Sequence, residues 1–175
     1  MRRHHSERVH VSDATIAVED RIQGRIAQHL SKEVGDFVLR RADGIHAYQL
    51  AVVVDDAAQQ IQHIIRGADL LLSTPRQIYL QQLLGLTRPT YAHLPLVLDA
   101  DGRKLSKSLA AVPIDPRNPL PALRRAWRFL GQTARREQAD SVEAFWQQAI
   151  ADWSPRKIPP HRALPVPATG VSTRE

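Results

Sequence analysis

A strand, a loop and a helix follow one another between residues 61 and 85, and this unit constrains the fold more than any other stretch. The apolar run 61–66 is typical of a buried strand. The sequence Ser73-Thr74-Pro75 then offers a helix cap with Pro in the first turn, and helix formers continue over 77–84 until Gly85. A unit of this kind favours an α/β layer architecture.

The flanking segments predict further short elements of both kinds. Upstream, residues 15–18, 25–30 and 36–41 favour strands, and the turn Ala42-Asp43-Gly44 leads into either a second hairpin strand or a helix over 48–60. Downstream, the apolar stretch 91–98 contains Pro95, which predicts an edge strand or two short pieces. Amphipathic helices are expected over 122–131 and 141–153.

Length and composition predict one core with two ends outside it. The chain has 175 residues, of which 43% are hydrophobic. We expect a flexible lead over 1–11, a single folded body over 12–153, and a disordered Pro-rich tail over 154–175.

Charge and cysteine content narrow the functional classes. The 24 Lys and Arg residues exceed the 18 Asp and Glu residues, and the resulting +6 is compatible with a nucleic-acid partner. The absence of cysteine excludes disulfides and thiolate zinc sites, and the histidines near the start lack partners that would suggest a metal site. No apolar run approaches the roughly 20 residues of a membrane span. The basic start leads into no apolar segment, so we do not expect it to be a secretory signal. We expect a cytoplasmic protein.

The stretch from Asp99 to Ser108 concentrates groups that bind phosphate. Asp101-Gly102 is a tight-turn dipeptide, and Lys104-Leu105-Ser106-Lys107-Ser108 follows it with two ammonium groups and two hydroxyls. Composition alone favours an exposed, solvated turn over a nucleotide site. The order of the residues favours a nucleotide-binding loop.

This loop resembles the KMSKS signature of class I aminoacyl-tRNA synthetases, with Leu in place of Met. Residues 35–44, 48–56, 65–71 and 73–77 are similar to successive blocks of the glutamyl-tRNA synthetase catalytic domain, in that family's order and spacing. The resemblance covers about residues 12–131 and is strongest to the glutamyl-Q tRNA(Asp) synthetase branch. It implies an α/β fold, namely the later half of a Rossmann-like catalytic domain with a short helical carboxy-terminal region.

The same resemblance implies an activity and its partners. The expected reaction is ATP-dependent activation of L-glutamate and its transfer to the queuosine base of tRNA(Asp), with Mg²⁺ accompanying ATP. No membrane and no obligate protein partner are expected. Two alternatives remain open: a fragment of a glutamyl-tRNA synthetase, and a tRNA-binding remnant without activity.

Five residues receive roles from the resemblance. Lys107 is expected to be the catalytic contact to the ATP phosphates, and Lys104 and Ser106 support the loop and the outer phosphates. Arg66 is expected to bind the side-chain carboxylate of glutamate, and the hydroxyl of Tyr48 is expected to contact the same substrate.

Each glutamate-site residue also has a simpler interpretation. Tyr48 could be a core aromatic, and Arg66 could form a surface ion pair with Asp69. Asp55 and Asp56 resemble a general acid/base pair, but glutamate activation needs none, so we expect them to make local hydrogen bonds.

The sequence departs from the family at its amino-terminal side. It lacks the first nucleotide-binding strand, the HIGH signature and the cysteine-based zinc site of many glutamyl-Q enzymes. We therefore expect it to represent the carboxy-terminal part of such an enzyme, whose activity requires the missing half.

Overall fold

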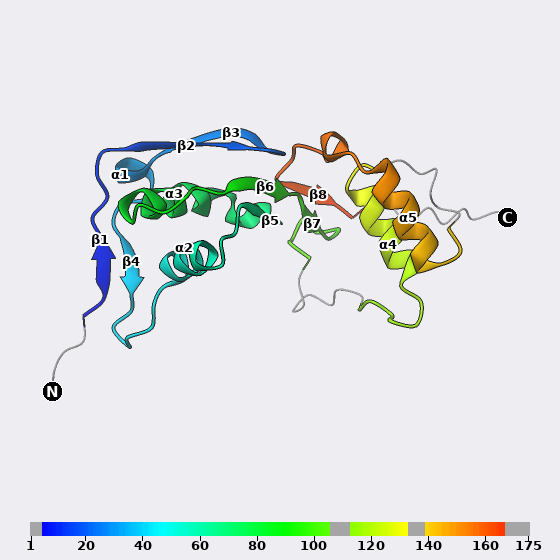
Figure 1. The fold of residues 1–175 in the computed structure, drawn as a ribbon, viewed down its shortest axis with the longest axis horizontal. Helices are drawn as coiled ribbons and strands as arrows, with labels where there is room; N and C mark the ends of the chain where they lie inside the picture. Colours follow the sequence, from blue (N-terminus) through cyan, green and yellow to red (C-terminus); the bar gives the residue numbers. More distant parts are fainter. Residues whose placement is uncertain (1–4, 106–112, 133–138, 167–175) are drawn as a thin grey trace. The chain divides into compact units, whose positions relative to one another are not determined.

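The computed structural model describes residues 5–105, 113–132 and 139–166, and it divides into two compact units, residues 1–93 and 94–175 (Figure 1). The first unit contains β1 (Glu7–Val9), β2 (Thr15–Asp20), β3 (Gly24–His29), α1 (Leu30–Glu33), β4 (Phe37–Arg40), α2 (Tyr48–Ala58), β5 (His63–Gly67), the 3-10 helix η1 (Ala68–Ser73), α3 (Thr74–Leu83) and β6 (Thr90–Leu94). Strand β6 ends one residue beyond the boundary of this unit. Those of the second are β7 (Leu96–Leu98), α4 (Leu120–Phe129), α5 (Val142–Asp152), the 3-10 helix η4 (Pro155–Lys157) and β8 (Ala163–Pro165).

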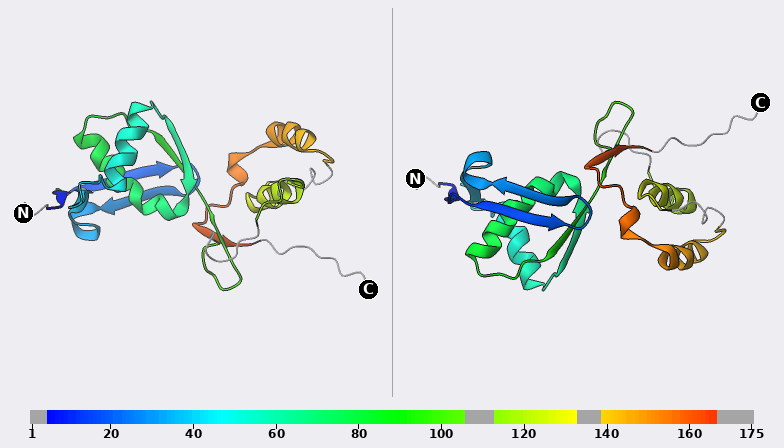
Figure 2. Two further views of the ribbon diagram at one scale, coloured as in Figure 1. Left: turned by 90° about the horizontal axis from the view of Figure 1, so that it is seen from below. Right: turned by 90° about the horizontal axis from the view of Figure 1, so that it is seen from above.

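A hairpin and two helices form the body of the first unit. β2 and β3 pair antiparallel from Thr15 opposite His29 to Asp20 opposite Gly24. This hairpin covers α3, and α3 packs against α2 (Figures 1 and 2). Alternate residues of β2 are buried, so its apolar side chains join the core. The core is made of Val11, Ile16, Val18, Leu30, Phe37, Val53, Ile78, Tyr79, Leu80 and Tyr91.

The strand, loop and helix predicted between residues 61 and 85 are present, but the expectation of a buried strand is wrong, because no residue of β5 is buried and Ile65 is 68% exposed. β5 leads through η1 into α3, and the chain then returns in β6, which pairs with β5. Helix α2 begins at Tyr48, so the chain enters a helix there. Before it, residues 45–47 pair antiparallel with the end of β4, since the Ala47 N–H donates to the Leu39 carbonyl and Arg40 forms a bridge with His46. A short hairpin is thus followed by a helix, and each of the two alternatives is found in part. Pro95 separates β6 from β7, as the alternative of two short pieces predicts. Among the described residues, strands pair two by two in four sheets.

Three local expectations need correction. Glu7–Val9 in the predicted flexible lead form β1, which pairs antiparallel with β4. The predicted disordered tail is ordered over much of its length, because β8 pairs in parallel with β7. Residues 167–175 lie outside the described part. Ser73 precedes α3 but its side chain makes no cap, since its Oγ accepts a hydrogen bond from Gln49 instead.

The second unit has its own apolar core between α4 and α5, so the expectation of one core within a single folded body over 12–153 is wrong. Trp127 and Phe145 are buried there, with ring centroids 5.9 Å apart in an edge-to-face arrangement. Helix α5 begins where the Ser141 hydroxyl accepts a hydrogen bond from the Ala144 N–H at 3.1 Å. Within the described part of the chain, no helix has the length and apolar character that crossing a membrane requires.

Candidate functional site

A buried chain of polar side chains crosses the first unit and begins at Asp20. This residue ends β2, and its Oδ1 accepts hydrogen bonds from the backbone N–H groups of Ile22, Gln23 and His93 at 2.9–3.1 Å. Its Oδ2 lies 2.6 Å from Nδ1 of His93, and both side chains are fully buried. The tight turn of the β2–β3 hairpin thus places a carboxylate against the imidazole carried by β6.

The Asp20 carboxylate is held in its charged form. Burial acts to raise its pKa, but the hydrogen bonds from the His93 side chain and from the backbone of Gln23, His93 and Ile22 outweigh burial and lower it. A buried anion with four donors is satisfied without a cation in contact.

Arg66, which lies on β5, and Thr74 face the other side of the imidazole. The Arg66 Nε donates to Nε2 of His93 at 3.0 Å, and the Thr74 hydroxyl lies 3.3 Å from the same nitrogen. Since a guanidinium nitrogen only donates, Nε2 must carry the lone pair, and the ring proton sits on Nδ1, where it is donated to Asp20. His93 is therefore a neutral imidazole of defined tautomer between an anion and a cation.

Two further acceptors hold the other edge of the guanidinium. Nη2 of Arg66 donates to Thr74 Oγ1 at 3.0 Å and to Gln77 Oε1 at 2.6 Å, and both acceptors are buried in the first turn of α3. The amide of Gln77 donates in turn to Gln49 Oε1 on α2 at 2.9 Å. Side chains of β6 and α3 thus hold Arg66, and α2 supports them through the contact between Gln49 and Gln77.

One nitrogen of Arg66 remains for a ligand. The guanidinium lies over the ring of Tyr91, with Cζ 5.6 Å from the centroid. Its Nε and Nη2 are occupied, whereas the described residues offer Nη1 no hydrogen-bond partner. Arg66 is only partly buried, and Nη1 is the guanidinium nitrogen that no described residue occupies.

Asp56 on α2 is a carboxylate that interacts electrostatically with Arg66. Partial burial raises its pKa, the charge of Arg66 acts to lower it, and neighbouring Asp55 acts to raise it. The prediction that Asp55 and Asp56 make local hydrogen bonds holds only for their backbone carbonyls, which accept from Gln59 and Ile61. In the described structure neither carboxylate has a hydrogen-bond donor.

Tyr48 occupies an accessible position. It is the first residue of α2 and is 51% exposed, so the core interpretation is wrong. Its hydroxyl is available to a ligand, although the structure describes no hydrogen bond between Tyr48 and Arg66.

The basic loop is described only in part. Its turn is formed as predicted: Asp99 Oδ1 accepts from the N–H groups of Asp101 and Arg103, and Gly102 has a φ of 75°. Lys104 pairs with Leu98 through an isolated antiparallel bridge. Ser106 and Lys107, with the remainder of the signature, lie outside the described residues.

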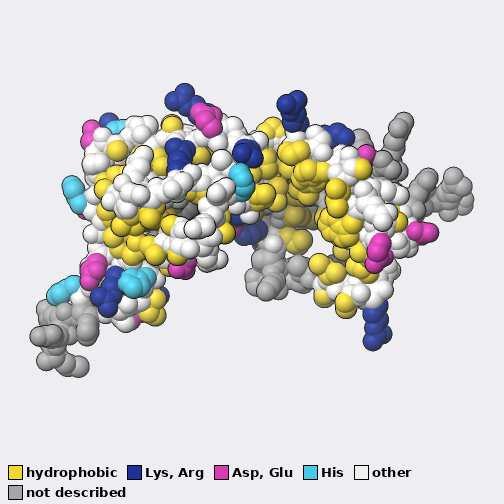
Figure 3. Space-filling model, in the orientation of Figure 1, with side chains coloured by type: hydrophobic (Ala, Val, Ile, Leu, Met, Phe, Trp, Pro, Cys, Tyr) yellow, Lys and Arg dark blue, Asp and Glu magenta, His cyan; other side chains and the backbone are white. Residues whose placement is uncertain are grey.

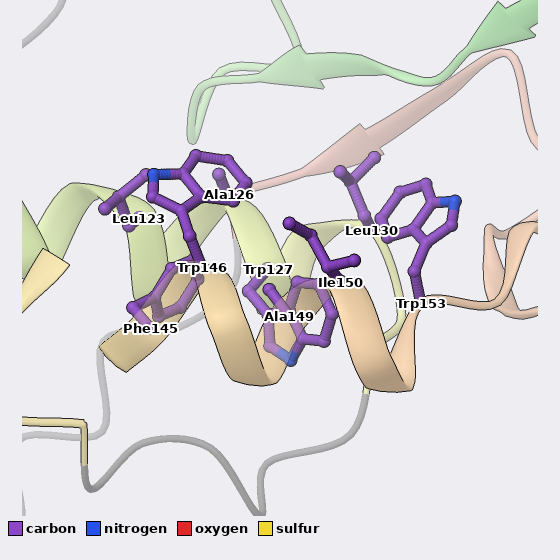
Figure 4. A pocket seen from close by; sticks show the side chains of 9 residues that line it. All are labelled: Leu123, Ala126, Trp127, Leu130, Phe145, Trp146, Ala149, Ile150 and Trp153. Carbon is purple, nitrogen blue, oxygen red and sulfur yellow. The ribbon is translucent and has the colours of Figure 1, made fainter. Parts of the chain in front are cut away.

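The α4–α5 pair contains a cavity of different character. It encloses about 310 Å³ and is lined entirely by apolar side chains, with aromatic rings from both helices (Figure 4). No charged side chain lines it, so it lacks the groups that a carboxylate or a phosphate needs. The polar chain around Arg66 is the better candidate site.

The sequence predicted a site role for Arg66 but did not indicate the residues that hold it, Asp20, His93, Thr74 and Gln77. One signal was available: in the strand around Tyr91, the alternation of facing side chains places His93 on the same buried face as Tyr91. A polar residue on a core face requires a partner, but the pattern does not say which residue that partner is.

Comparison with known proteins identifies the fold and the family. Residues 3–115 match the family described as tRNA synthetases class I (E and Q), catalytic domain. The chain belongs to this family. It is 61% identical over 142 residues to a glutamyl-Q tRNA(Asp) synthetase of Xanthomonas campestris pv. campestris, covering 81% of this chain and 48% of that protein.

A second relative and a solved structure also match this chain. A glutamyl-Q tRNA(Asp) synthetase of Verminephrobacter eiseniae is 55% identical over 162 residues, covering 90% of this chain and 55% of that protein. The crystal structure of a glutamate-tRNA synthetase from Elizabethkingia anophelis matches with a TM-score of 0.69 at 24% identity, covering 90% of this chain and 35% of that one. The structural match confirms the class I fold. The chain spans about half the length of the curated relatives it matches.

Proposed function

We propose that this chain supplies the glutamate-binding side and the basic loop of a class I synthetase site that activates glutamate with ATP and transfers it to the queuosine base of tRNA(Asp). The observation that carries the proposal is the guanidinium of Arg66, held by three neutral acceptors with Nη1 left for a ligand. The curated relatives, which are named for that transfer, support the tRNA assignment.

The partners of Arg66 favour a carboxylate ligand. Its three hydrogen bonds go to an imidazole, a hydroxyl and an amide, so no carboxylate neutralises the guanidinium through them. A ligand carboxylate at Nη1 would form a charge-assisted hydrogen bond, which is stronger than a neutral one. The amide of glutamine offers only a neutral oxygen and a donor group that guanidinium repels. L-Glutamate is therefore preferred over L-glutamine.

The chemistry of activation assigns the remaining residues. A carboxylate oxygen of glutamate attacks the α-phosphorus of ATP, the bond to the bridging oxygen breaks, and pyrophosphate leaves with the negative charge. In this proposal Lys107 neutralises charge that grows on the leaving group, while Lys104 and Ser106 hold the loop and the outer phosphates. Mg²⁺ enters with ATP as part of that substrate, and the hydroxyl of Tyr48 contacts glutamate.

The test is glutamate-dependent ATP–pyrophosphate exchange. The chain is combined in trans with the amino-terminal half of the Xanthomonas campestris relative, because the chain covers only 48% of that protein. We expect exchange with glutamate and much weaker exchange with glutamine. Arg66→Ala should raise the glutamate KM by about 10- to 100-fold, as expected for loss of a hydrogen bond between charged groups.

The matched control is Arg41→Ala, which removes an exposed arginine paired with Asp43 at 2.7 Å. It should leave the glutamate KM unchanged, because exposed ion pairs contribute little. Equal KM values for wild type and Arg66→Ala would remove Arg66 from the glutamate site. Binding of tRNA(Asp) with no exchange under any condition would instead support the tRNA-binding remnant.

A further inference from the structure

We infer that Asp20 and His93 are positioning residues for glutamate recognition: by fixing the tautomer of His93, the Asp20 carboxylate sets the direction in which Arg66 presents Nη1 to the substrate. This inference rests on the proposed function. Neither residue touches the ligand in this arrangement, since both side chains are fully buried behind Arg66.

The geometry requires one defined tautomer. Nε of Arg66 lies 3.0 Å from Nε2 of His93 and always bears a hydrogen, so the imidazole must offer a lone pair there. The imidazole proton is then on Nδ1, 2.6 Å from Oδ2 of Asp20. An anion at this position stabilises that tautomer by accepting its hydrogen bond.

The orientation of Arg66 depends on the same contact. A guanidinium is planar, so an acceptor at Nε together with acceptors at Nη2 fixes the plane and the direction of the remaining edge. The acceptor at Nε is His93, and those at Nη2 are Thr74 and Gln77. If Nε2 of His93 carried a proton, two donors would face each other and Arg66 would rotate or withdraw.

The charged groups around Arg66 support an orienting role rather than neutralisation. Asp20 is separated from Arg66 by the whole imidazole ring, so its charge does not occupy the guanidinium directly. Asp56, on α2, interacts with Arg66 electrostatically without a hydrogen bond to it. The edge that faces the ligand therefore stays available for a carboxylate.

The test substitution is Asp20→Asn. The three backbone N–H groups that converge on Oδ1 require an oxygen there, so the asparagine amide group must face Nδ1 of His93. An N–H facing Nδ1 moves the ring proton to Nε2, directly opposite Nε–H of Arg66. The substitution is nearly isosteric but reverses the hydrogen-bond polarity of the relay.

Two measurements follow the substitution. In the wild-type chain, ¹⁵N NMR of the imidazole nitrogens should show His93 protonated on Nδ1, and in Asp20→Asn on Nε2. In the complemented exchange assay, Asp20→Asn should raise the glutamate KM by about tenfold with little change in kcat, since Arg66 binds the substrate carboxylate alike in the ground and transition states. Mere destabilisation would lower the active fraction, and hence the apparent kcat, and leave KM unchanged.

The matched control is Tyr79→Phe on α3. Its hydroxyl lies within 3.2–3.3 Å of Ser12 and of the His10 carbonyl and does not contact the Arg66 cluster. This change should lower the melting temperature without altering the glutamate KM or the tautomer of His93. If Asp20→Asn does not fold, His93→Phe keeps a ring beside Tyr91 but removes the acceptor, and the same rise in KM is expected.

The outcomes separate the two proposals. An unchanged tautomer in Asp20→Asn, or a switched tautomer with an unchanged glutamate KM, overturns the positioning role. For His93→Phe, an unchanged KM does the same. Absence of glutamate-dependent exchange by the wild type refutes the proposed function and with it the positioning role, even if the ¹⁵N spectra then confirm the tautomer relay as a purely structural feature.

Discussion

The two units of this protein bury different kinds of side chain. The first unit holds a chain of hydrogen-bonded polar groups, from Asp20 through His93 to Arg66, inside an apolar core. The second unit packs aromatic rings of α4 and α5 and leaves part of that apolar surface open, with Trp146 49% and Ile150 76% exposed. Figure 3 shows hydrophobic side chains at the surface over these helices.

We expect substitutions in the two units to have different consequences. Apolar packing is non-directional, so a change between α4 and α5 should alter the free energy of unfolding without redirecting any group. Hydrogen bonds are directional, and in the first unit the bonds that satisfy buried polar groups also fix the orientation of the Arg66 guanidinium. A substitution there should therefore change stability and substrate affinity together.

The largest expected effect tests the packing side of the comparison. Trp127→Ala removes a buried ring that contacts Phe145 and Trp153 at centroid distances of 5.9 Å. It should lower the free energy of unfolding by about 3–5 kcal/mol, measured by denaturant titration. Ile150→Ala, whose side chain lines the same cavity but is 76% exposed, is the control and should change it by less than about 0.5 kcal/mol. Comparable losses for both would mean that the two helices pack differently.

The second prediction asks whether the two units contribute to different kinetic constants. Lys107→Ala should lower kcat of glutamate activation about 100-fold, because Lys107 is proposed to stabilise charge that develops only in the transition state. Lys104→Ala should have a milder effect. The measurement is ATP–pyrophosphate exchange over a range of ATP and glutamate concentrations. Pure KM effects of equal size for both lysines would contradict the assignment.

The third prediction compares one glycine of each unit. Gly131 has a φ of 68°, and a Cβ there would overlap the backbone carbonyl of Lys157, whereas Gly35 has a φ of 70° with open space around it. Gly131→Ala should cost about 2–3 kcal/mol through both strain and overlap, and Gly35→Ala about 1 kcal/mol through strain alone. Thermal unfolding of both variants measures the difference, and equal costs would refute the close approach at Gly131.

The smallest effect concerns acid stability of the polar chain. Hydrogen bonds lower the pKa of Asp20 in the folded protein, so the unfolded state binds more protons as the pH falls toward the ordinary value of 3.8. The stabilisation is complete above that value and is lost as the pH falls through the lowered pKa. Asp20→Asn should flatten the decline of unfolding free energy with acidification over this range.

Asp36 leaves a remaining acid dependence in that variant. Its pKa is also lowered, chiefly by the hydrogen bond from the Val11 N–H, so some decline should persist in Asp20→Asn. Asp36→Asn provides the comparison. If Asp20→Asn followed the wild-type curve between pH 5 and the acid limit, Asp20 would not be the stabilised carboxylate that the structure indicates.

Local patterns in the sequence determined much of the first unit. Strands near β2 and β3, the helix from Tyr48 and the unit from β5 to α3 were predicted from alternation, helix formers and turn residues, all of which act between near neighbours. The resemblance of ordered blocks predicted the class I synthetase family, which the family match confirms, whereas the site role of Arg66 stays a prediction. The turn at Gly102 was also readable from Asp101-Gly102.

Only the tertiary structure showed what holds Arg66 and how the end of the chain is used. Asp20 and His93 are 73 residues apart in sequence, and alternation indicates that a side chain is buried but not which distant group satisfies it. In the same way, the segment that forms β8 was predicted to belong to a disordered Pro-rich tail. Its order comes from pairing with β7, which its own composition does not reveal. Both features depend on long-range hydrogen bonds, whose partners are chosen by how the chain packs and not by the residues beside them in sequence.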